Sequence, residues 1–185
     1  MIYATLASWG MHKMGDPDKT KAKLVSYSGF KKSIHLHGDR LRALSLVGMH
    51  SCDLKEYEGR IDELEVVYND LEVSIAEATI VANSKTLAHI LPNLIPPIDR
   101  QYTVRFFTQE YADFFNKSGK FKPITLPYGI KAQFEDFKKY CLAIKGLFDR
   151  CDPAMFEINK ETFNTSYPKI IDNCIVAFVK DMQKP

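Results

Sequence analysis

The stretch "DLKEYEGRIDELEVVYNDLE", residues 53–72, shows the clearest structural pattern in the chain. Asp53, followed three residues later by Glu56, matches the signature of a capping box at a helix N-terminus. Apolar residues then recur at alternating spacings of three and four, which places them on one face of an α-helix. They are Leu54, Tyr57, Ile61, Leu64, Tyr68 and Leu71. The opposite face is acidic, so the stretch predicts a helix that packs on one side and meets water on the other.

Helical spacing also appears on both sides of this stretch. Helices are predicted over residues 3–14, in short pieces over 27–50 broken near Gly38, over 75–91 up to Pro92, over 100–115, from Pro127 to Phe148, and from about Pro168. Residues 116–127, "NKSGKFKPITLP", predict an exposed loop or short hairpin. No stretch shows sustained alternation of the kind that marks a strand. The sequence therefore predicts a mainly α-helical fold, a single-domain bundle of about six to eight helices over residues 1–185.

Length and composition are those of a globular domain. The chain has 185 residues, 45% of them hydrophobic and 26% charged, which is enough to bury a core without staples. No apolar run approaches the roughly 20 residues that span a bilayer, so no membrane partner is predicted. The first residues lack the basic start of a secretory signal, which favours a cytoplasmic location. Oligomeric state is not indicated.

The cysteines and histidines do not form a metal-binding pattern. The four cysteines, at 52, 141, 151 and 174, contain no CxxC. Cys141 and Cys174 fall on apolar helical stripes and are expected to be buried, reduced thiols. His35 and His37 are two residues apart, a spacing that places both side chains on one side of a strand but not of a helix. We therefore predict four free thiols, no metal site and no cofactor.

Charge is unevenly distributed along the chain, although the net charge is only +2. Residues 1–52 carry a net charge of +5, residues 53–72 carry −6, and residues 101–150 carry +4. The acidic stretch could fold back on its basic neighbours and neutralise them, or the basic segments could form a basic surface elsewhere. In the simplest interpretation, all of these charges are ordinary solvated surface groups.

A second stretch, "SKTLAHILPNLIPPIDRQYT", residues 84–103, raises the question of function. Lys85 opens an apolar segment, two prolines interrupt it, and Asp99 follows directly. In a purely structural interpretation, Asp99 is the N-cap of the helix that begins at Arg100. Ser84 or Asn83 would cap the preceding helix in the same way, which would leave Lys85 as a solvent-facing residue of the first turn.

The same residues resemble the core of the helix-hairpin-helix DNA glycosylases, over about residues 80–103. The shared features are a lysine–threonine pair at the start of an apolar helix, a proline-rich turn and an aspartate at the head of the next helix. In that superfamily a glycine-containing hairpin binds DNA phosphates through backbone amides, and its lysine attacks the sugar C1′ of a flipped nucleotide. The resemblance implies that Lys85 is the nucleophile and Asp99 its electrostatic or acid–base partner. Val81 and Asn83 stand where the hairpin has glycines.

The resemblance also implies a DNA partner. The hairpin contacts would come from Asn83 and Ser84. Basic support for the phosphate backbone would come from Arg100, Arg105, Lys117, Lys120 and Lys122. The leading hypothesis is therefore a nucleic-acid-binding protein, glycosylase- or lyase-like, with or without activity.

Two alternatives remain open at the level of sequence. In the first, the chain is a non-enzymatic helical interaction or structural module, and the 80–103 segment is only scaffold. In the second, Asp99 acts with His89 or Tyr102 in a pocket for a small molecule. No nucleotide-binding loop, dinucleotide fingerprint, serine-hydrolase elbow or zinc-protease motif is present. A basic groove at Lys85 would favour nucleic-acid binding, whereas an apolar or acidic surround would favour the interaction module.

Overall fold

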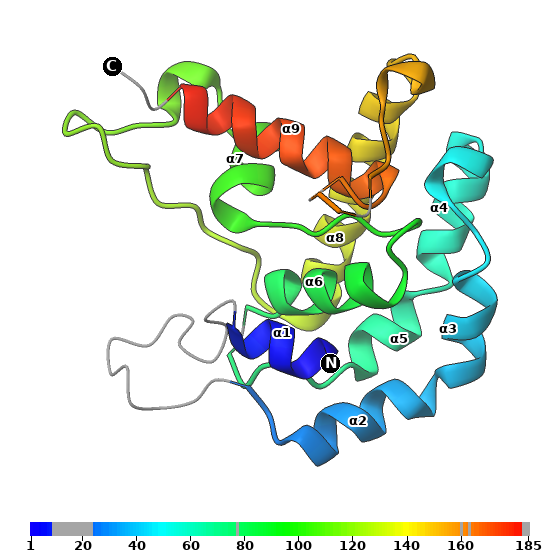
Figure 1. The fold of residues 1–185 in the computed structure, drawn as a ribbon. Helices are drawn as coiled ribbons and strands as arrows, with labels where there is room; N and C mark the ends of the chain where they lie inside the picture. Colours follow the sequence, from blue (N-terminus) through cyan, green and yellow to red (C-terminus); the bar gives the residue numbers. More distant parts are fainter. Residues whose placement is uncertain (9–23, 77, 160, 163, 183–185) are drawn as a thin grey trace.

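Helix α8 (Ile130–Phe148) is the longest helix of the described residues, and four other helices pack against it (Figure 1). The computed structural model describes residues 1–8, 24–76, 78–159, 161–162 and 164–182. α8 contacts α4, α5, α6 and α9, and its apolar stripe supplies buried residues to the core. The helix follows Gly129, whose φ of 85° favours glycine. It therefore begins three residues beyond Pro127, where the sequence predicts its first turn.

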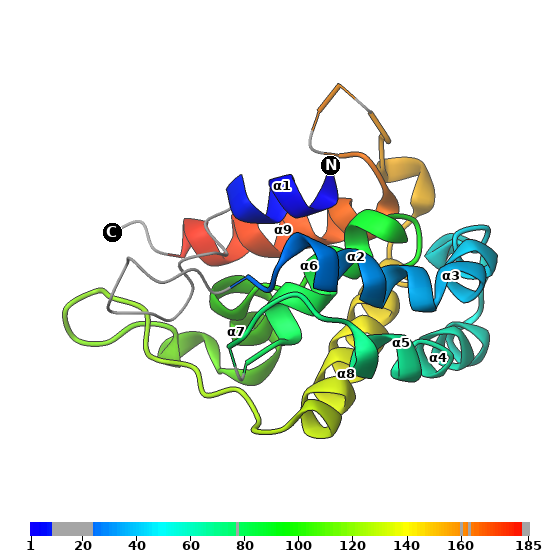
Figure 2. The same ribbon diagram turned by 90° about the horizontal axis from the view of Figure 1, so that it is seen from below.

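The described residues form helices and connecting loops, so the predicted mainly α-helical class is confirmed. The remaining α-helices are α1 (Ile2–Ser8), α2 (Tyr27–Leu36), α3 (Gly38–Leu44), α4 (Leu54–Asp62), α5 (Glu65–Asp70), α6 (Ile80–Ile90), α7 (Arg105–Thr108) and α9 (Tyr167–Asp181). Short 3-10 turns lie at Met49–Ser51, Tyr111–Asp113 and Pro153–Met155, and a π-helical turn lies at Arg100–Val104. α1 packs along α6, and α9 packs on α8 and on the π-helical turn (Figures 1 and 2).

The acidic stretch forms two helices, α4 and α5, rather than the single predicted helix. The capping box is present, since Asp53 Oδ1 accepts from the Glu56 amide at 2.8 Å and Glu56 Oε2 accepts from the Asp53 amide at 3.1 Å. The helix is interrupted after Asp62, where the Leu64 amide bonds to the carbonyl of Ile61 in a tighter turn. The predicted apolar face still points inward across the break, apart from Leu54, which is 49% exposed.

Basic groups from both flanking segments pair with this acidic region. Lys138 of α8 lies 2.9 Å from Glu58 Oε1 and 2.6 Å from Asp62 Oδ1, and hydrogen bonds to these two carboxylates raise the pKa of Lys138. On the other side, His37 Nε2 lies 2.9 Å from Asp70 Oδ2. Part of the acidic stretch therefore folds against basic neighbours, while the paired carboxylates stay about half exposed to solvent.

Several predicted boundaries shift. Residues 9–14 of the first predicted helix lie outside the described residues. The helix predicted over 75–91 begins at Ile80, and the helix predicted over 100–115 ends at Thr108. Residues 116–127 form a loop, and Phe121 within it makes an antiparallel bridge with Phe115 just before it, in agreement with the predicted loop or short hairpin. α9 begins at Tyr167 with Ser166 as its N-cap, one residue before the predicted start.

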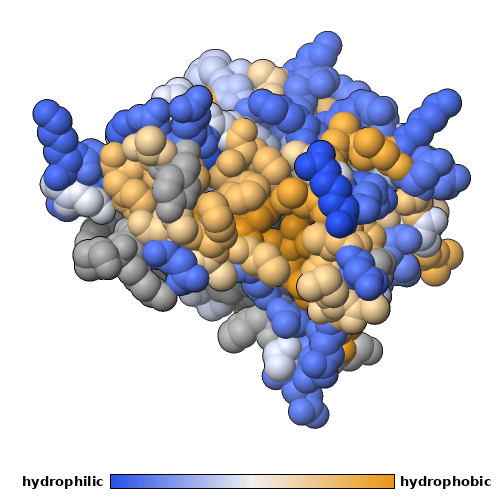
Figure 3. Space-filling view, turned by 90° about the horizontal axis from the view of Figure 1, so that it is seen from above, coloured by the Kyte–Doolittle hydropathy of each residue, from blue (hydrophilic) through white to orange (hydrophobic). Residues whose placement is uncertain are grey.

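The upper side of the molecule in Figure 1 carries a concentration of apolar side chains around a hollow (Figure 3). α9 runs along this side. Its inner face buries Ile171 and Ile175, whereas Phe178 is 43% exposed and meets the ring of Phe106 edge-on at 5.5 Å. Cys174 is also exposed, contrary to the prediction that it is buried, because it lies on the outer side of the same helix. Cys141 is buried as predicted, and all four cysteines are free.

Candidate functional site

The N-terminus of α6 is closed by a side chain from the central helix. Gln133 Oε1 of α8 accepts hydrogen bonds from the Thr79 amide at 2.7 Å, the Ile80 amide at 3.0 Å and the Thr79 hydroxyl at 3.1 Å. α6 therefore begins at Ile80, and neither Asn83 nor Ser84 caps it. These first amides, which a phosphate-binding hairpin would present to DNA, are directed at Gln133.

Asn83 and Ser84 lie inside α6 and are fully buried. The Asn83 side-chain amide donates to the carbonyl of Tyr68 at 3.1 Å. The Ser84 hydroxyl donates to the Ile98 carbonyl at 3.3 Å and accepts from the Ile98 amide at 3.1 Å. Neither residue is on a surface that a nucleic acid could reach, so the predicted hairpin contacts are replaced by a structural role. Ser84 fixes the end of the proline-rich turn against α6.

That attachment brings Lys85 and Asp99 together. Lys85 directly follows Ser84 on α6, and Asp99 directly follows Ile98 at the end of the proline-rich turn. Lys85 Nζ lies 3.4 Å from Asp99 Oδ2, and the two side chains are 20% and 29% exposed. Lys85 is therefore a partly buried residue in the middle of α6, not the solvent-facing first-turn residue that the structural interpretation predicts.

Asp99 is also the N-cap of the next helical element, as predicted. Its Oδ1 accepts from the amide of Gln101 at 2.7 Å and from that of Tyr102 at 3.3 Å. Its own amide donates to the Thr103 hydroxyl at 3.1 Å. The two carboxylate oxygens therefore have separate roles: Oδ1 holds the start of the π-helical turn, and Oδ2 faces Lys85.

Lys85 and Asp99 lie on the wall of a cavity of about 230 Å³ between α6, the π-helical turn and α9. We call it the acidic cavity, because two carboxylates line it. Its lining residues are Lys85, Pro97, Asp99, Tyr102, Lys169, Asp172 and Val176. Two lysines and two carboxylates thus share one small space, and a ligand there would meet donors and acceptors of both signs.

Lys169 and Asp172 are functional candidates that sequence reasoning missed. Lys169 Nζ lies 2.6 Å from Asp172 Oδ2, and the Asp172 side chain is only 6% exposed. Burial raises the pKa of Asp172, while Lys169 opposes the shift. The signal in the sequence was an aspartate on the otherwise apolar stripe that Ile171 and Ile175 define, because a buried carboxylate is rare unless it is paired.

The predicted basic residues do not all face solvent. Arg100 is exposed beside Asp99, and Lys117 and Lys120 are exposed on the loop. Lys122 is ion-paired with Asp113. The base of the loop reaches the acidic cavity, because the ring of Phe121 packs in a T-shaped contact with the ring of Tyr102, which lines that cavity. The two ring centroids are 6.1 Å apart.

Arg105 is fully buried, so it cannot contact a nucleic acid in this structure. Its guanidinium donates to the carbonyls of Gln101, Phe114 and Lys122 at 2.7–3.0 Å and stacks over Phe121, 4.4 Å from the ring centroid. Burial lowers the pKa of Arg105. The predicted phosphate contact is therefore a scaffold residue, and it positions the loop that carries Lys117 and Lys120.

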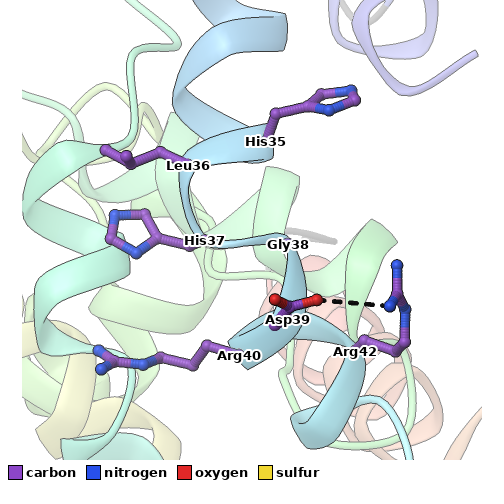
Figure 4. Close-up of a pocket in the computed structure, with 7 residues that line it drawn as sticks. All are labelled: His35, Leu36, His37, Gly38, Asp39, Arg40 and Arg42. Atoms are coloured by element: carbon purple, nitrogen blue, oxygen red, sulfur yellow. Dashed lines mark hydrogen bonds and ion pairs between the residues drawn. The ribbon is translucent and has the colours of Figure 1, made fainter.

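A separate pocket lies at the turn between α2 and α3 (Figure 4). Its lining residues are His35, Leu36, His37, Gly38, Asp39, Arg40 and Arg42. The rings of His35 and His37 point in different directions from the backbone, so they do not converge on one ligand. Arg42 pairs with Asp39 in the exposed part of this pocket. Across the described residues, no group of three or more candidate ligands is placed to hold a metal ion.

No protein family, curated protein or solved structure matches this chain. The helices of the described segments include none with the length and apolar character needed to cross a membrane.

Proposed function

We propose that this protein binds DNA and processes abasic sites in it, with Lys85 as the nucleophile and Asp99 as its electrostatic partner. The observation that carries the proposal is the approach of Lys85 Nζ to within 3.4 Å of Asp99 Oδ2, partly buried at a cavity. A lysine exposed on a first helical turn would not support this role. These are the two residues to which the resemblance to the helix-hairpin-helix glycosylases assigns the chemistry.

The chemistry requires a neutral amine and an electrophilic carbon. The Asp99 carboxylate, 3.4 Å away, first accepts a proton from the Lys85 ammonium. In the ring-opened abasic sugar, the resulting neutral amine attacks the C1′ aldehyde, a C–N bond forms, and the proton passes from Asp99 to the carbonyl oxygen, which leaves Asp99 ionised again. Loss of water gives an iminium ion, whose positive charge the nearby Asp99 carboxylate stabilises. Removal of a proton from C2′ then breaks the C3′–O bond and releases a phosphate as the leaving group. Asp172, which also lines the cavity, is a second carboxylate that could carry a proton.

Cationic and aromatic groups around the acidic cavity favour a nucleic-acid strand. Lys169 lines the cavity, Arg100 is exposed next to Asp99, and Lys180 Nζ lies 5.7 Å from the centroid of the Tyr102 ring. Tyr102 lines the cavity with a partly exposed aromatic ring, the kind of side chain that contacts nucleic-acid bases. Lys117 and Lys120 extend this basic surface along the loop next to Tyr102. These residues replace Asn83, Ser84 and Arg105 as the proposed DNA contacts.

The test is borohydride trapping on a duplex that contains one abasic site. We expect a covalent protein–DNA adduct with the unaltered chain and none with Lys85→Ala. Lys31→Ala is the matched control, because Lys31 is an exposed lysine on α2 away from the cavity, and it should retain the adduct. An adduct that persists in Lys85→Ala would come from another amine and would contradict the role of Lys85.

Two other outcomes would separate the remaining hypotheses. Salt-sensitive DNA binding without an adduct would refute the lyase chemistry and leave a binding module. Absence of any DNA binding would refute the proposal as a whole and favour the non-enzymatic interaction module.

A further inference from the structure

A second cavity of about 230 Å³ lies beside the acidic cavity and shares Lys85, Pro97 and Lys169 with it. Its lining residues are Lys85, Ala88, His89, Pro92, Ile95, Pro97, Thr162, Thr165, Ser166 and Lys169. We call it the basic cavity, because three basic side chains and no carboxylate are among these residues. The exposed Thr165 adds a hydroxyl as a neutral donor, whereas the Thr162 hydroxyl donates to the Asn159 carbonyl at 3.0 Å and Ser166 is buried as the N-cap of α9.

The basic side chains come from two helices that face each other across the cavity. Lys85 and His89 are one turn apart on α6, so they lie on the same face of that helix. Lys169 belongs to the first turn of α9, where the Ser166 hydroxyl accepts from its amide at 3.4 Å. Ser166 is 2% exposed, which fixes this end of α9 against the cavity. The positive end of the helix dipole adds to the charge of the side chains.

His89 makes the cavity responsive to a bound anion. Partial desolvation, and then the nearby Lys169, lower the pKa of His89. The charged groups around it are Lys85 on its own helix and Lys169 on α9, with Asp99 and Asp172 in the neighbouring acidic cavity. An anion between His89 and the two lysines would stabilise the imidazolium form and reverse the direction of the shift.

We propose that the basic cavity is a phosphate-binding subsite, which holds a backbone phosphate of the DNA strand next to the abasic sugar. This inference rests on the proposed function, because Lys85 and Lys169 line both cavities and would place sugar and phosphate side by side. Charge-assisted donors from lysine, histidine and hydroxyl groups are the chemistry that recognises a phosphate. A free phosphorylated sugar offers the same group, so the test includes both sources.

The direct test is an NMR titration of the His89 ring in the unaltered chain, with the signal assigned by its loss in His89→Gln. Inorganic phosphate should raise the pKa of His89 in a saturable way. Lys169→Met should weaken phosphate binding at least tenfold, and Lys31→Met, at an exposed position on α2, should leave it unchanged. Because Lys169→Met leaves Asp172 without its ion pair, Thr165→Val, at an exposed position, serves as a second variant and should weaken binding by a smaller factor.

Competition then identifies the source of the phosphate. Displacement of inorganic phosphate by an abasic duplex would support a DNA phosphate in the cavity. Displacement only by ribose 5-phosphate would keep the subsite but overturn its assignment to DNA. If phosphate leaves His89 unchanged while the Lys85 adduct still forms, the subsite is refuted and the lyase function stands. If His89 responds to phosphate but no adduct forms, the proposed chemistry fails and the subsite remains.

Discussion

The acidic and basic cavities share three wall residues but differ in the charges that surround them. Both have Lys85 and Lys169 on their walls. The acidic cavity adds Asp99 and Asp172, which suits the formation and stabilisation of a cation. The basic cavity adds His89 and the Thr165 hydroxyl, which suits the binding of an anion.

The comparison shows how two lysines can serve two sites. Each is held by a carboxylate on the acidic side, Lys85 by Asp99 and Lys169 by Asp172. An ammonium group carries three N–H donors, so an ion pair on one side is compatible with a hydrogen bond to an anion on the other. If this division is correct, substitutions in one cavity should have effects that the other cavity does not show.

The largest expected effect is that of Asp99→Asn on the proposed chemistry. Asparagine caps a helix about as well as aspartate, so the loss of stability should be that of the partly exposed Lys85 ion pair alone, at most about 1 kcal/mol. Loss of the carboxylate charge should slow adduct formation by about 10²-fold, measured as a time course of borohydride trapping. The response of His89 to phosphate should be unchanged. Parallel losses of trapping and phosphate binding would show that the two cavities act as one site.

A smaller effect is expected for Asp99→Ala on stability. This variant loses the two amide hydrogen bonds of the cap as well as the charge, and it should cost about 1 kcal/mol in urea unfolding. Lys85→Ala should cost at most about 1 kcal/mol, because it removes a partly exposed ion pair that is screened by solvent. Both variants remove the ion pair and only Asp99→Ala removes the cap, so equal losses for the two would show that the ion pair, not the cap, is the main structural contribution.

The smallest expected effects are changes in how stability depends on pH, and they have opposite signs in the two cavities. The pKa of Asp172 is raised in the folded state. Its carboxyl group therefore contributes to the free energy of unfolding fully at pH values below its unfolded-state pKa of about 3.9, and this contribution is lost as pH rises through the folded-state pKa. The stability of Asp172→Asn relative to the unaltered chain should therefore increase as pH rises from about 4 to 7.

The pKa of His89 is lowered in the folded state. Its neutral imidazole therefore contributes to the free energy of unfolding at pH values above the unfolded-state pKa of about 6.5, and this contribution is lost as pH falls. The stability of His89→Gln relative to the unaltered chain should increase as pH falls from about 7 to 5. Urea unfolding of both variants across this range measures the two trends. Trends of the same sign would contradict the difference between the cavities.

Much of the local structure could be predicted because its determinants lie within one or two turns. The capping box of Asp53 and Glu56 and the Asp99 cap each join residues no more than three apart. The start of α9 near Pro168 follows the same rule. Helical periodicity likewise identified most of the buried face of the 53–72 stretch, and it did so even though the helix is broken after Asp62.

Where the sequence-based predictions were wrong, a distant partner decided the outcome. Gln133, 54 residues from Thr79, sets the beginning of α6, so Asn83 and Ser84 are buried instead of capping that helix. Carbonyls of Phe114 and Lys122 surround Arg105 and turn an expected phosphate contact into scaffold. No local pattern records these partners.

The sequence by itself determined the helical class, most of the inward faces and the Asp99 cap, because helices and caps are made by neighbours along the chain. Only the tertiary structure decided that Lys85 is partly buried against Asp99 and that Lys169 and Asp172 join them. These contacts unite α6 and the proline-rich turn that follows it with α9, which lies far along the chain. Ser84 and Ile98, 14 residues apart, fix this geometry by reciprocal hydrogen bonds in the core.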